Sequence, residues 1–375
     1  MSKIVELITE LAPNGVRHVP LSEVAGYATT RVDASQLDEV TFVGVDNLVA
    51  NKGGKINANY LPNTARLTGY KCGDILLGNI RPYLKKAWRA TSDGGCSGDV
   101  LAIRISEDAQ RVLSSEFLYY LLSSDEFFAY NMQHAKGGKM PRGSKPAILA
   151  YRIPVPPLEV QREIVRILDT FTELEAELEA ELEARCQQYE HYRAELLKLP
   201  NAGTVQLSQL INGLSSGRNK SRVEGGKYPV YGSTGKIGST DQASFENDAL
   251  LVARVGANAG RVNAVSGSYD VSDNTLIVIP NEKWHERFAF HQLTSMNLNQ
   301  YAVGGGQPLI TGRLLKGLEV PVPAIKEQRR IAELLDKFDD LVNNLSVGLP
   351  AELNARRKQY EYYRDKLLTF DEVPA

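Results

Sequence analysis

Apolar and aromatic side chains recur in steps of three and four along residues 159–199, with no Gly or Pro among them. They are Val160, Ile164, Ile167, Phe171, Leu174, Leu178, Leu182, Tyr189, Tyr192 and Leu196. This spacing predicts one amphipathic helix, which at about 1.5 Å per residue would extend roughly 60 Å. A helix of that length needs a partner helix. Residues 326–370 supply one, with a break expected at Gly348-Leu349-Pro350.

Both helical segments belong to an internal repeat. Pro-Val-Pro at 154–156, followed by Gln161-Arg162, recurs at 321–323, followed by Gln328-Arg329, at an offset of 167 residues. Further along, the motif at 189–193 recurs at 360–364 with an offset of 171 residues, so the second copy is longer by four. The Pro-rich entries fix an extended approach and then start each helix.

The repeat also reaches into the segments that precede the helices. The matching pairs are Gly137–Pro141 with Gly304–Pro308, which aligns Gly138 with Gly305, Asp74–Leu77 with Asp248–Leu251, and Val19–Val24 with Val205–Leu210. Short apolar runs at 100–105 and 275–279 predict strands. We therefore expect an α+β chain with a pseudo-twofold repeat. It has globular α/β domains at 1–150, with a short N-terminal helix, and at 201–318, and long helices within 151–200 and 319–375. A mere doubling of a scaffold is disfavoured, because the helices match closely while the globular cores differ.

Charge follows the same division of the chain. The net charge is −2 overall, but residues 1–150 carry +2 and residues 201–318 carry +3, whereas 151–200 carry −5 and 319–375 carry −2. Mildly basic globular parts favour a polyanionic partner, and acidic helices favour protein contacts. Three widely spaced cysteines and the lack of a long apolar run or signal peptide predict a cytoplasmic protein without a structural metal.

Motifs of several enzyme classes are missing from the sequence. There is no phosphate-binding Gly-x4-Gly-Lys-Ser/Thr loop, no Gly-x-Gly-x-x-Gly after a strand, and no Asn/Asp-Pro-Pro-aromatic tetrad of amino-methyltransferases. No lysine follows an acidic residue at the nuclease spacing, and the five histidines form no ligand-spaced pair on a helix. We therefore expect a chain that is not an enzyme.

Two dissimilar globular domains, each followed by a nearly identical long helix, resemble the specificity subunit of Type I restriction–modification systems. The motifs that carry the resemblance are Pro154–Arg162, Pro321–Arg329, Gly73–Pro82 and Tyr228–Gly232. The duplicated order, which covers essentially the whole chain, is the most specific of these features.

The resemblance implies that each globular domain is a target-recognition domain that reads one half of a split site in double-stranded DNA. It also implies that the helices form an antiparallel coiled coil, which separates the domains and docks two methyltransferase subunits. S-adenosylmethionine would be bound by those subunits, ATP and Mg²⁺ by restriction and translocase subunits, and no cofactor by this chain. The amphipathic stretch Lys3–Leu11 would close the ring against the C-terminal segment.

Two basic loops of the first domain are candidate DNA contacts. One contains Arg81, Tyr83, Lys85 and Lys86 just after a predicted buried strand, and the other contains Lys136, Lys139 and Arg142 among glycines. Arginine pairs with guanine edges, and lysine holds phosphates. A solvated basic loop and a plain structural turn remain the alternatives, and the second loop matches Gly304–Gln307.

In the second domain the candidates lie in three segments, namely Arg218, Lys220, Arg222 and Lys227; Ser233 and Lys236; and Arg254, Asn258 and Arg261. Tyr231 could pack in the core while Ser233, Thr234 and Lys236 face DNA. Asp99 and Asn274 occupy equivalent positions after Ser97 and Ser272, where Asn274 either reads adenine or caps a turn.

Three tandem copies of Glu-Leu-Glu-Ala fill residues 173–184 of the first long helix. Their leucines, Leu174, Leu178 and Leu182, are four residues apart and so drift around the helix relative to a heptad seam. A low-complexity solvated helix is one interpretation. The other is a ruler that sets the distance between the half-sites. A coiled-coil scaffold with two protein-binding heads remains the rival to the whole DNA-reading hypothesis.

Overall fold

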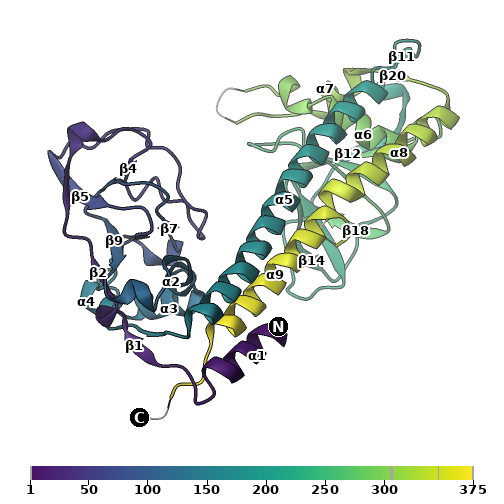
Figure 1. Ribbon diagram of the computed structural model, residues 1–375. Coiled ribbons are helices and arrows are strands. Elements are labelled where there is room, and N and C mark those ends of the chain that lie inside the picture. Colours follow the sequence, from purple (N-terminus) through teal and green to yellow (C-terminus); the bar gives the residue numbers. More distant parts are fainter. Residues whose placement is uncertain (1, 305–306, 345, 374–375) are drawn as a thin grey trace. The chain divides into compact units, whose positions relative to one another are not determined.

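The computed structural model describes residues 2–304, 307–344 and 346–373. The chain divides into two compact units (Figure 1), Met1–Ala176 with Ala355–Ala375, and Glu177–Asn354. The division falls inside the long helices. The predicted helix at 151–200 is α5 (Leu158–Leu196), which begins in the first unit and ends in the second.

The first unit contains two four-stranded sheets. One has the order β2 (Ala25–Tyr27), β9 (Val100–Ile105), β6 (Ile75–Gly78) and β7 (Ala87–Arg89), and the other β3 (Arg31–Asp33), β5 (Arg66–Tyr70), β8 (Gly94–Cys96) and β4 (Phe42–Val43). Every residue of β6 is buried, because Ile75 and Leu77 enter one core cluster while Leu76 enters another. Helices α2 (Ser115–Leu122), α3 (Asp125–Gln133) and α4 (Lys145–Ala150) bury side chains in the first of these cores.

The second unit repeats this plan. Its first sheet has the order β12 (Ile211–Ser216), β19 (Thr275–Pro280), β16 (Ala249–Ala253) and β17 (Val262–Val265), and its second β14 (Gly235–Thr240), β13 (Tyr228–Gly232), β18 (Ser268–Val271) and β15 (Phe245–Glu246). In β16, Leu250 and Val252 enter one core and Leu251 another, as alternating side chains of a strand must. Helices α6 (Glu286–Ser295) and α7 (Gly312–Gly317) follow.

The equivalences expected from the sequence are confirmed by the topology. Asp74–Leu77 and Asp248–Leu251 lead into the corresponding strands β6 and β16. The segments at 19–24 and 205–210 each begin at the end of a strand in corresponding two-stranded ladders, β1 (His18–Pro20) with β10 (Arg152–Pro154) and β11 (Gly203–Gln206) with β20 (Glu319–Val322), and continue into a short 3-10 helix. The fold is thus a mixed α/β duplication with long helices.

A fully buried glutamine ties the start of α5 to the first globular part. The Nε2 atom of Gln161 donates to the carbonyls of Val112 and Pro156, at 2.6 and 2.7 Å, and its Oε1 accepts from the Ser114 amide at 2.9 Å. A buried amide must satisfy both ends, and this one does so on backbone groups alone.

Gln328 repeats this arrangement at the start of α8 (Ile325–Asn343) in the second unit. It donates to the carbonyls of Lys283 and Pro323, at 2.9 and 2.8 Å, and accepts from the His285 amide at 2.8 Å. In both copies of the repeated Gln-Arg motif, the glutamine therefore anchors the start of a long helix to the preceding backbone.

Gln328→Ala is expected to lower the free energy of unfolding by about 2–3 kcal/mol, since it leaves three backbone groups without their partner. Denaturant unfolding of the full chain measures this effect. Gln187→Ala, at an exposed position of α5, is the matched control and should change little. Equal unfolding midpoints for the two variants would contradict the anchoring role.

The long helices pack through aromatic side chains within each unit. In the first unit, Phe171 of α5 lies 6.1 and 5.8 Å from the rings of Tyr360 and Tyr363 on α9 (Leu349–Leu368), and Glu175 pairs with Arg357 at 2.6 Å. As α5 advances from 171 to 175, its partner on α9 moves backward, so the two helices run antiparallel there.

The predicted break in the second long helix is confirmed. Helix α8 ends at Asn343, α9 begins at Leu349, and Gly348 between them has φ +90. A Cβ at Gly348 would lie 2.6 Å from the carbonyl oxygens of Asp340 and Leu341, so only glycine fits. Pro350 then occupies the first turn of α9, where its missing N–H costs nothing.

The two ends of the chain meet in the first unit. Helix α1 (Ser2–Leu11) buries Ile4 in the core that includes Leu367 and Leu368. The backbone closure lies just after this helix, where the Val16 amide donates to the Asp371 carbonyl at 2.8 Å and the Val16 carbonyl accepts from Val373 at 3.2 Å. The packing of Lys3–Leu11 against the C-terminal segment, which the resemblance implies, thus takes the form of a core shared with the end of α9, and Val16 adds two backbone hydrogen bonds. No helix in the described part of the chain is long and apolar enough to span a membrane.

Candidate nucleic-acid interface

The two basic loops of the first unit meet at the end of β6. The Arg81 amide donates to the Pro141 carbonyl at 2.7 Å, and the Asn79 amide donates to the Asp99 carbonyl at 2.8 Å. Arg142 Nε lies 3.3 Å from Asp99 Oδ1. Segments that begin near residues 79, 99 and 136 therefore share one edge of the sheet, with the Arg81 and Arg142 side chains exposed.

The glycine-rich loop is a closed turn. Lys136 and Arg142 exchange both backbone hydrogen bonds, at 2.9 and 2.8 Å, and leave Lys136 and Lys139 exposed. Val303 and Leu309 exchange the same pair of bonds at 3.0 Å in the second unit. The two loops are thus equivalent, as the sequence match predicted, although Gly305 and Gly306 lie outside the described residues.

Lys85 belongs to a cluster of charges rather than to a free surface. Its Nζ lies 2.6 Å from Asp125 Oδ1, and Asp125 also binds Lys52 at 3.3 Å and Arg364 at 2.6 Å. Burial raises the pKa of Asp125, but hydrogen bonds from Lys85 and Arg364 outweigh it, so the pKa lies well below its ordinary value. No local sequence signal marks this cluster, because Arg364 lies 239 residues from Asp125.

The remaining candidates of this loop differ in exposure. Lys86 donates from Nζ to the Val45 carbonyl at 2.7 Å, whereas the Tyr83 side chain is 50% exposed. Arg81 and Tyr83 are therefore the exposed members of this loop, and in the described part of the chain their side chains form no hydrogen bond or ion pair.

Left-handed backbone conformations are concentrated in the Arg81–Lys86 loop and in the loop bonded to it. Four of the six non-glycine residues with positive φ in the described chain are Asn51, Lys52, Arg81 and Lys85, with φ between 51 and 64. Two hydrogen bonds join their loops, from the Asn51 amide to the Leu84 carbonyl at 2.9 Å and from the Lys52 amide to the Lys85 carbonyl at 2.8 Å. Left-handed backbone costs energy and persists only where the surroundings hold it, which is common at functional sites.

The second unit places Arg254, Asn258 and Arg261 at the corresponding end of β16. The Arg254 amide, just after β16, donates to the Asn274 carbonyl at 2.9 Å, and the Arg254 carbonyl accepts from Ile310 at 2.8 Å. Asp99 and Asn274 are therefore equivalent, as predicted. Asn258 and Arg261 are exposed and close a turn, with a 3.0 Å hydrogen bond from the Arg261 amide to the Asn258 carbonyl.

The other candidates of this unit lie before and within the β13–β14 hairpin. Arg218, Lys220, Arg222, Lys227 and Lys236 are exposed, and Ser233 is half-buried in the hairpin turn. Lys227 Nζ lies 4.9 Å from the centre of the Tyr228 ring. Tyr231 packs edge-on against buried Tyr269, at 6.0 Å between centroids, as its predicted core position requires.

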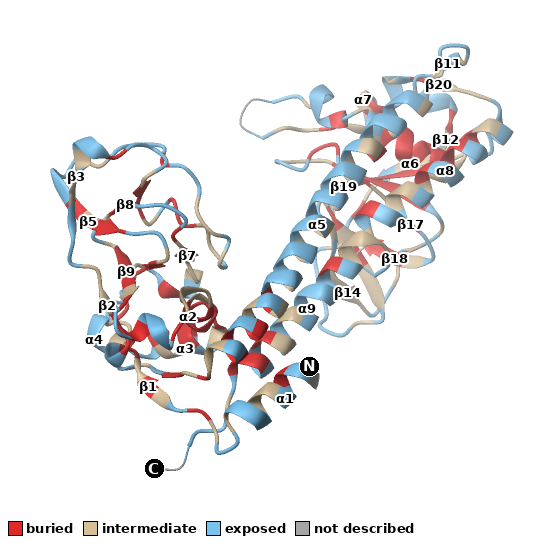
Figure 2. Cartoon of the chain, viewed as in Figure 1, coloured by how far each residue is buried: buried red, intermediate tan, exposed pale blue. Residues whose placement is uncertain are grey.

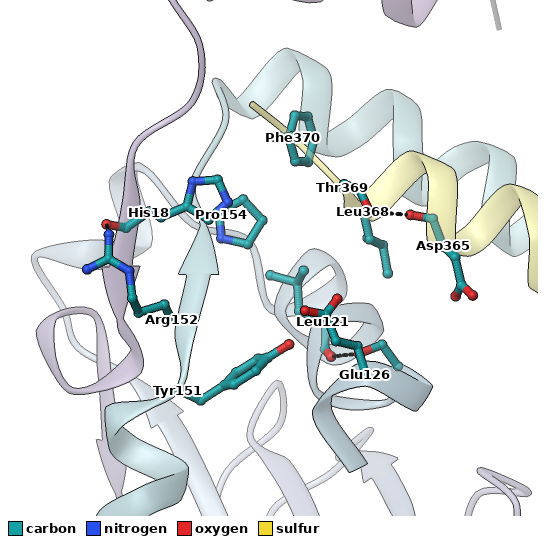
Figure 3. Close-up of a pocket in the computed structure, with 11 residues that line it drawn as sticks. His18, Leu121, Glu126, Tyr151, Arg152, Pro154, Asp365, Leu368, Thr369 and Phe370 are labelled. Carbon is teal, nitrogen blue, oxygen red and sulfur yellow. Dashed lines mark hydrogen bonds between the residues drawn. The ribbon is translucent and has the colours of Figure 1, made fainter. Parts of the chain in front are cut away.

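A cavity of about 220 Å³ in the first unit is lined by none of the predicted DNA contacts (Figure 3). It is lined where the chain ends meet, by His18, Tyr151, Arg152 and residues of the end of α9 such as Asp365. Within the described ranges, no group of three His, Cys, Asp or Glu residues is arranged to hold a metal ion.

Comparison with known proteins gives three relevant findings. The Type I restriction modification DNA specificity domain matches residues 96–184 and 205–355. The chain is 36% identical over 257 residues to the Type I restriction enzyme EcoR124I/EcoR124II specificity subunit of Escherichia coli, a match that covers 58% of this chain and 63% of that subunit. It is 37% identical over 203 residues to the Escherichia coli EcoprrI specificity subunit, covering 50% and 51%. The matches thus span between half and two thirds of these relatives.

Two solved structures share the fold. A chain from a structure of the type I R-M system aligns with a TM-score of 0.65 and 20% identity, covering 95% of this chain and 98% of that one. The Type-I restriction-modification S subunit of M. genitalium aligns with a TM-score of 0.60 and 15% identity, covering 94% and 96%.

Proposed function

The chain belongs to the family of Type I restriction–modification DNA specificity proteins, and from this premise we propose that it is the sequence-reading subunit of such a system. Each unit reads one half of a bipartite site in duplex DNA. The chain itself acts by binding, and partner subunits carry out the methyl transfer and cleavage.

The observation that carries this proposal is the equivalent position of the two sets of basic loops. Arg81, with the turn at 136–142, and Arg254, with the turn at 303–309, follow corresponding strands of corresponding sheets. A duplicated scaffold that offers different side chains at one edge is suited to reading two different half-sequences. Exposed Lys136, Lys139 and Lys236 add the positive charge that phosphates require.

The long helices are proposed to dock two methyltransferase subunits. Figure 2 shows α5 largely exposed between its ends, and residues 172–184 are exposed or half-buried. Leu174 is 43% exposed, while Leu178 and Leu182 are half-buried, as expected for leucines that drift off a heptad seam. S-adenosylmethionine would be held by the methyltransferase subunits, and ATP and Mg²⁺ by restriction subunits.

Binding to duplex DNA separates this function from that of a coiled-coil scaffold. The complex of the chain with its methyltransferase subunits should bind duplex DNA with an affinity that falls steeply as salt rises, because phosphate contacts release counterions. Omission of this chain should abolish the preference for one sequence. Sequence preference without the chain would contradict the proposal.

Arg81→Ala tests the assignment of one base reader. If the guanidinium contacts a base, its loss should cost about 1–3 kcal/mol for the cognate site and relax one position of one half-site. Competition binding with singly substituted duplexes measures this loss. Equal weakening on every sequence would make Arg81 a phosphate contact, and unchanged binding would exclude any contact.

A further inference from the structure

The second sheets of the two units share three strands. In the first unit the central strand β8 has β4 parallel on one side and β5 antiparallel on the other. In the second unit the central strand β18 has β13 parallel and β15 antiparallel. The chain between the parallel and the antiparallel strand is therefore the same connection in both copies, residues 44–65 in one and 233–244 in the other.

These equivalent connections differ in structure. In the second unit the connection begins with the turn of the β13–β14 hairpin and contains two of the predicted DNA contacts, Ser233 and Lys236. In the first unit it is a longer loop without a strand of either sheet. It contains none of the contacts predicted from charge. If the two units read different half-sites, residues that differ between the readings are expected where the common scaffold diverges.

The loop of the first unit is held in one conformation by buried Asn47. Asn47 is 2% exposed. Its side chain accepts a hydrogen bond from the Gly44 amide at 2.8 Å and donates one to the Asn57 carbonyl at 3.4 Å. Its carbonyl accepts from the Ile56 amide at 2.9 Å, and the Ala58 amide donates to the Glu39 carbonyl at 2.8 Å. Residues 56–61 therefore project from a fixed base.

The outward face of this loop is apolar and amide-rich. Ile56, Tyr60 and Leu61 are 52%, 56% and 55% exposed, and Asn57 and Asn59 lie exposed between them. Neighbouring exposed apolar side chains on an ordered loop mark a binding surface. Asparagine pairs with the edge of adenine through two hydrogen bonds, and apolar groups pack on the methyl group of thymine.

The loop that carries this face is joined to one of the basic loops. The loop is joined to the Arg81–Lys86 loop by the backbone bonds at Asn51 and Lys52, and by the 2.7 Å hydrogen bond from Lys86 Nζ to the Val45 carbonyl. A basic segment that holds the backbone of DNA and a neutral segment that contacts base edges are the two parts that sequence reading requires.

We infer that residues 56–61 contact base edges in the half-site of the first unit, with Asn57 and Asn59 directed to A·T pairs. This inference rests on the proposed function and specifies where its reading residues lie. The apolar side chains Ile56, Tyr60 and Leu61 supply the contacts to thymine methyl groups beside them.

The test uses the complete complex of the chain with its methyltransferase subunits. Asn57→Ala and Asn59→Ala are compared with the unaltered chain, and Gln110→Ala, an exposed amide elsewhere in the same unit, is the matched control. Methylation rates are measured on duplexes in which each A·T pair of either half-site is replaced in turn. At least one loop variant should lose about 10- to 100-fold of its discrimination at one A·T position of one half-site. The other half-site should be read as before.

Two results would overturn the inference while leaving the proposed function intact. Both apply when the unaltered complex methylates a split site. One is unchanged discrimination in both loop variants, and the other is a loss of methylation that is uniform over all sequences. A complex that methylates no split site even with the unaltered chain would instead remove the proposed function, and the inference with it. Thermal unfolding of each variant shows whether the fold is retained.

Discussion

Deletion of Glu177–Ala180 is expected to shorten the unread spacer of the recognised site by one to two base pairs and to leave both half-sequences unchanged. The deletion removes one of three tandem Glu-Leu-Glu-Ala copies in α5 and joins Ala176 to Glu181, so the repeat continues without a break. Four helical residues account for about 6 Å and for a rotation of roughly 40° beyond a full turn. One base pair accounts for about 3.4 Å along DNA.

The helix should survive this deletion because the repeat consists of good helix formers. Methylome sequencing of cells that carry the deletion variant and the methyltransferase subunits reads both half-sequences and the spacer at once. Glu177→Ala, which removes charge and keeps length, is the control and should leave the spacer unchanged. An active deletion variant with the original spacer would refute the ruler, and altered half-sequences would show that α5 also influences reading.

Asp125→Ala is expected to lower the free energy of unfolding by about 3–4 kcal/mol. It leaves the cations of Lys52, Lys85 and Arg364 without their common carboxylate. The Arg364 side chain is 1% exposed and keeps Asp365, which is 63% exposed, so the loss of Asp125 leaves a buried charge poorly compensated, which is destabilising. The figure lies near the lower end of such losses because Asp125 is 37% exposed and partly screened.

Asp365→Ala is the matched control for this variant. Asp365 binds the same guanidinium at 2.8 Å but is 63% exposed, so its loss should cost less than about 1 kcal/mol. Chemical denaturation of both variants compares the two effects directly. Equal losses would show that Asp125 has no special part in the cluster.

The same cluster predicts a dependence of stability on pH. The pKa of Asp125 in the folded chain lies below its ordinary value of 3.8, so the folded state favours the carboxylate. Its stabilising contribution is therefore present above about pH 4 and is lost as the pH falls below that value. As the pH falls below about 4, the free energy of unfolding of the unaltered chain should therefore decrease more than that of Asp125→Asn, as denaturant unfolding at a series of pH values would measure.

The parts of the fold that local patterns specify could be predicted from the sequence. The apolar spacing of α5, the glycine and proline at 348–350, and the repeated strands β6 and β16 all follow from rules that act over a few residues. The repeat also located the equivalent turns at 136–142 and 303–309.

The candidate interface could be predicted only where charge marks it. Arg81 and Lys136 became candidates because basic residues stand out in a sequence. The pairing of Lys85 with Asp125 was missed, since Asp125 lies 40 residues further along the chain and only the fold brings the two side chains together. The loop at 56–61 was also missed, because asparagine, isoleucine and tyrosine are unremarkable until the fold places them on an exposed, ordered surface.

Methylome sequencing of cells with and without this chain, each carrying the cognate methyltransferase subunits, tests the central proposal most directly. A bipartite motif of two fixed half-sequences around an unread spacer should be methylated only when the chain is present. Identical methylation patterns in the two cell lines would contradict the proposal that this chain reads the DNA sequence.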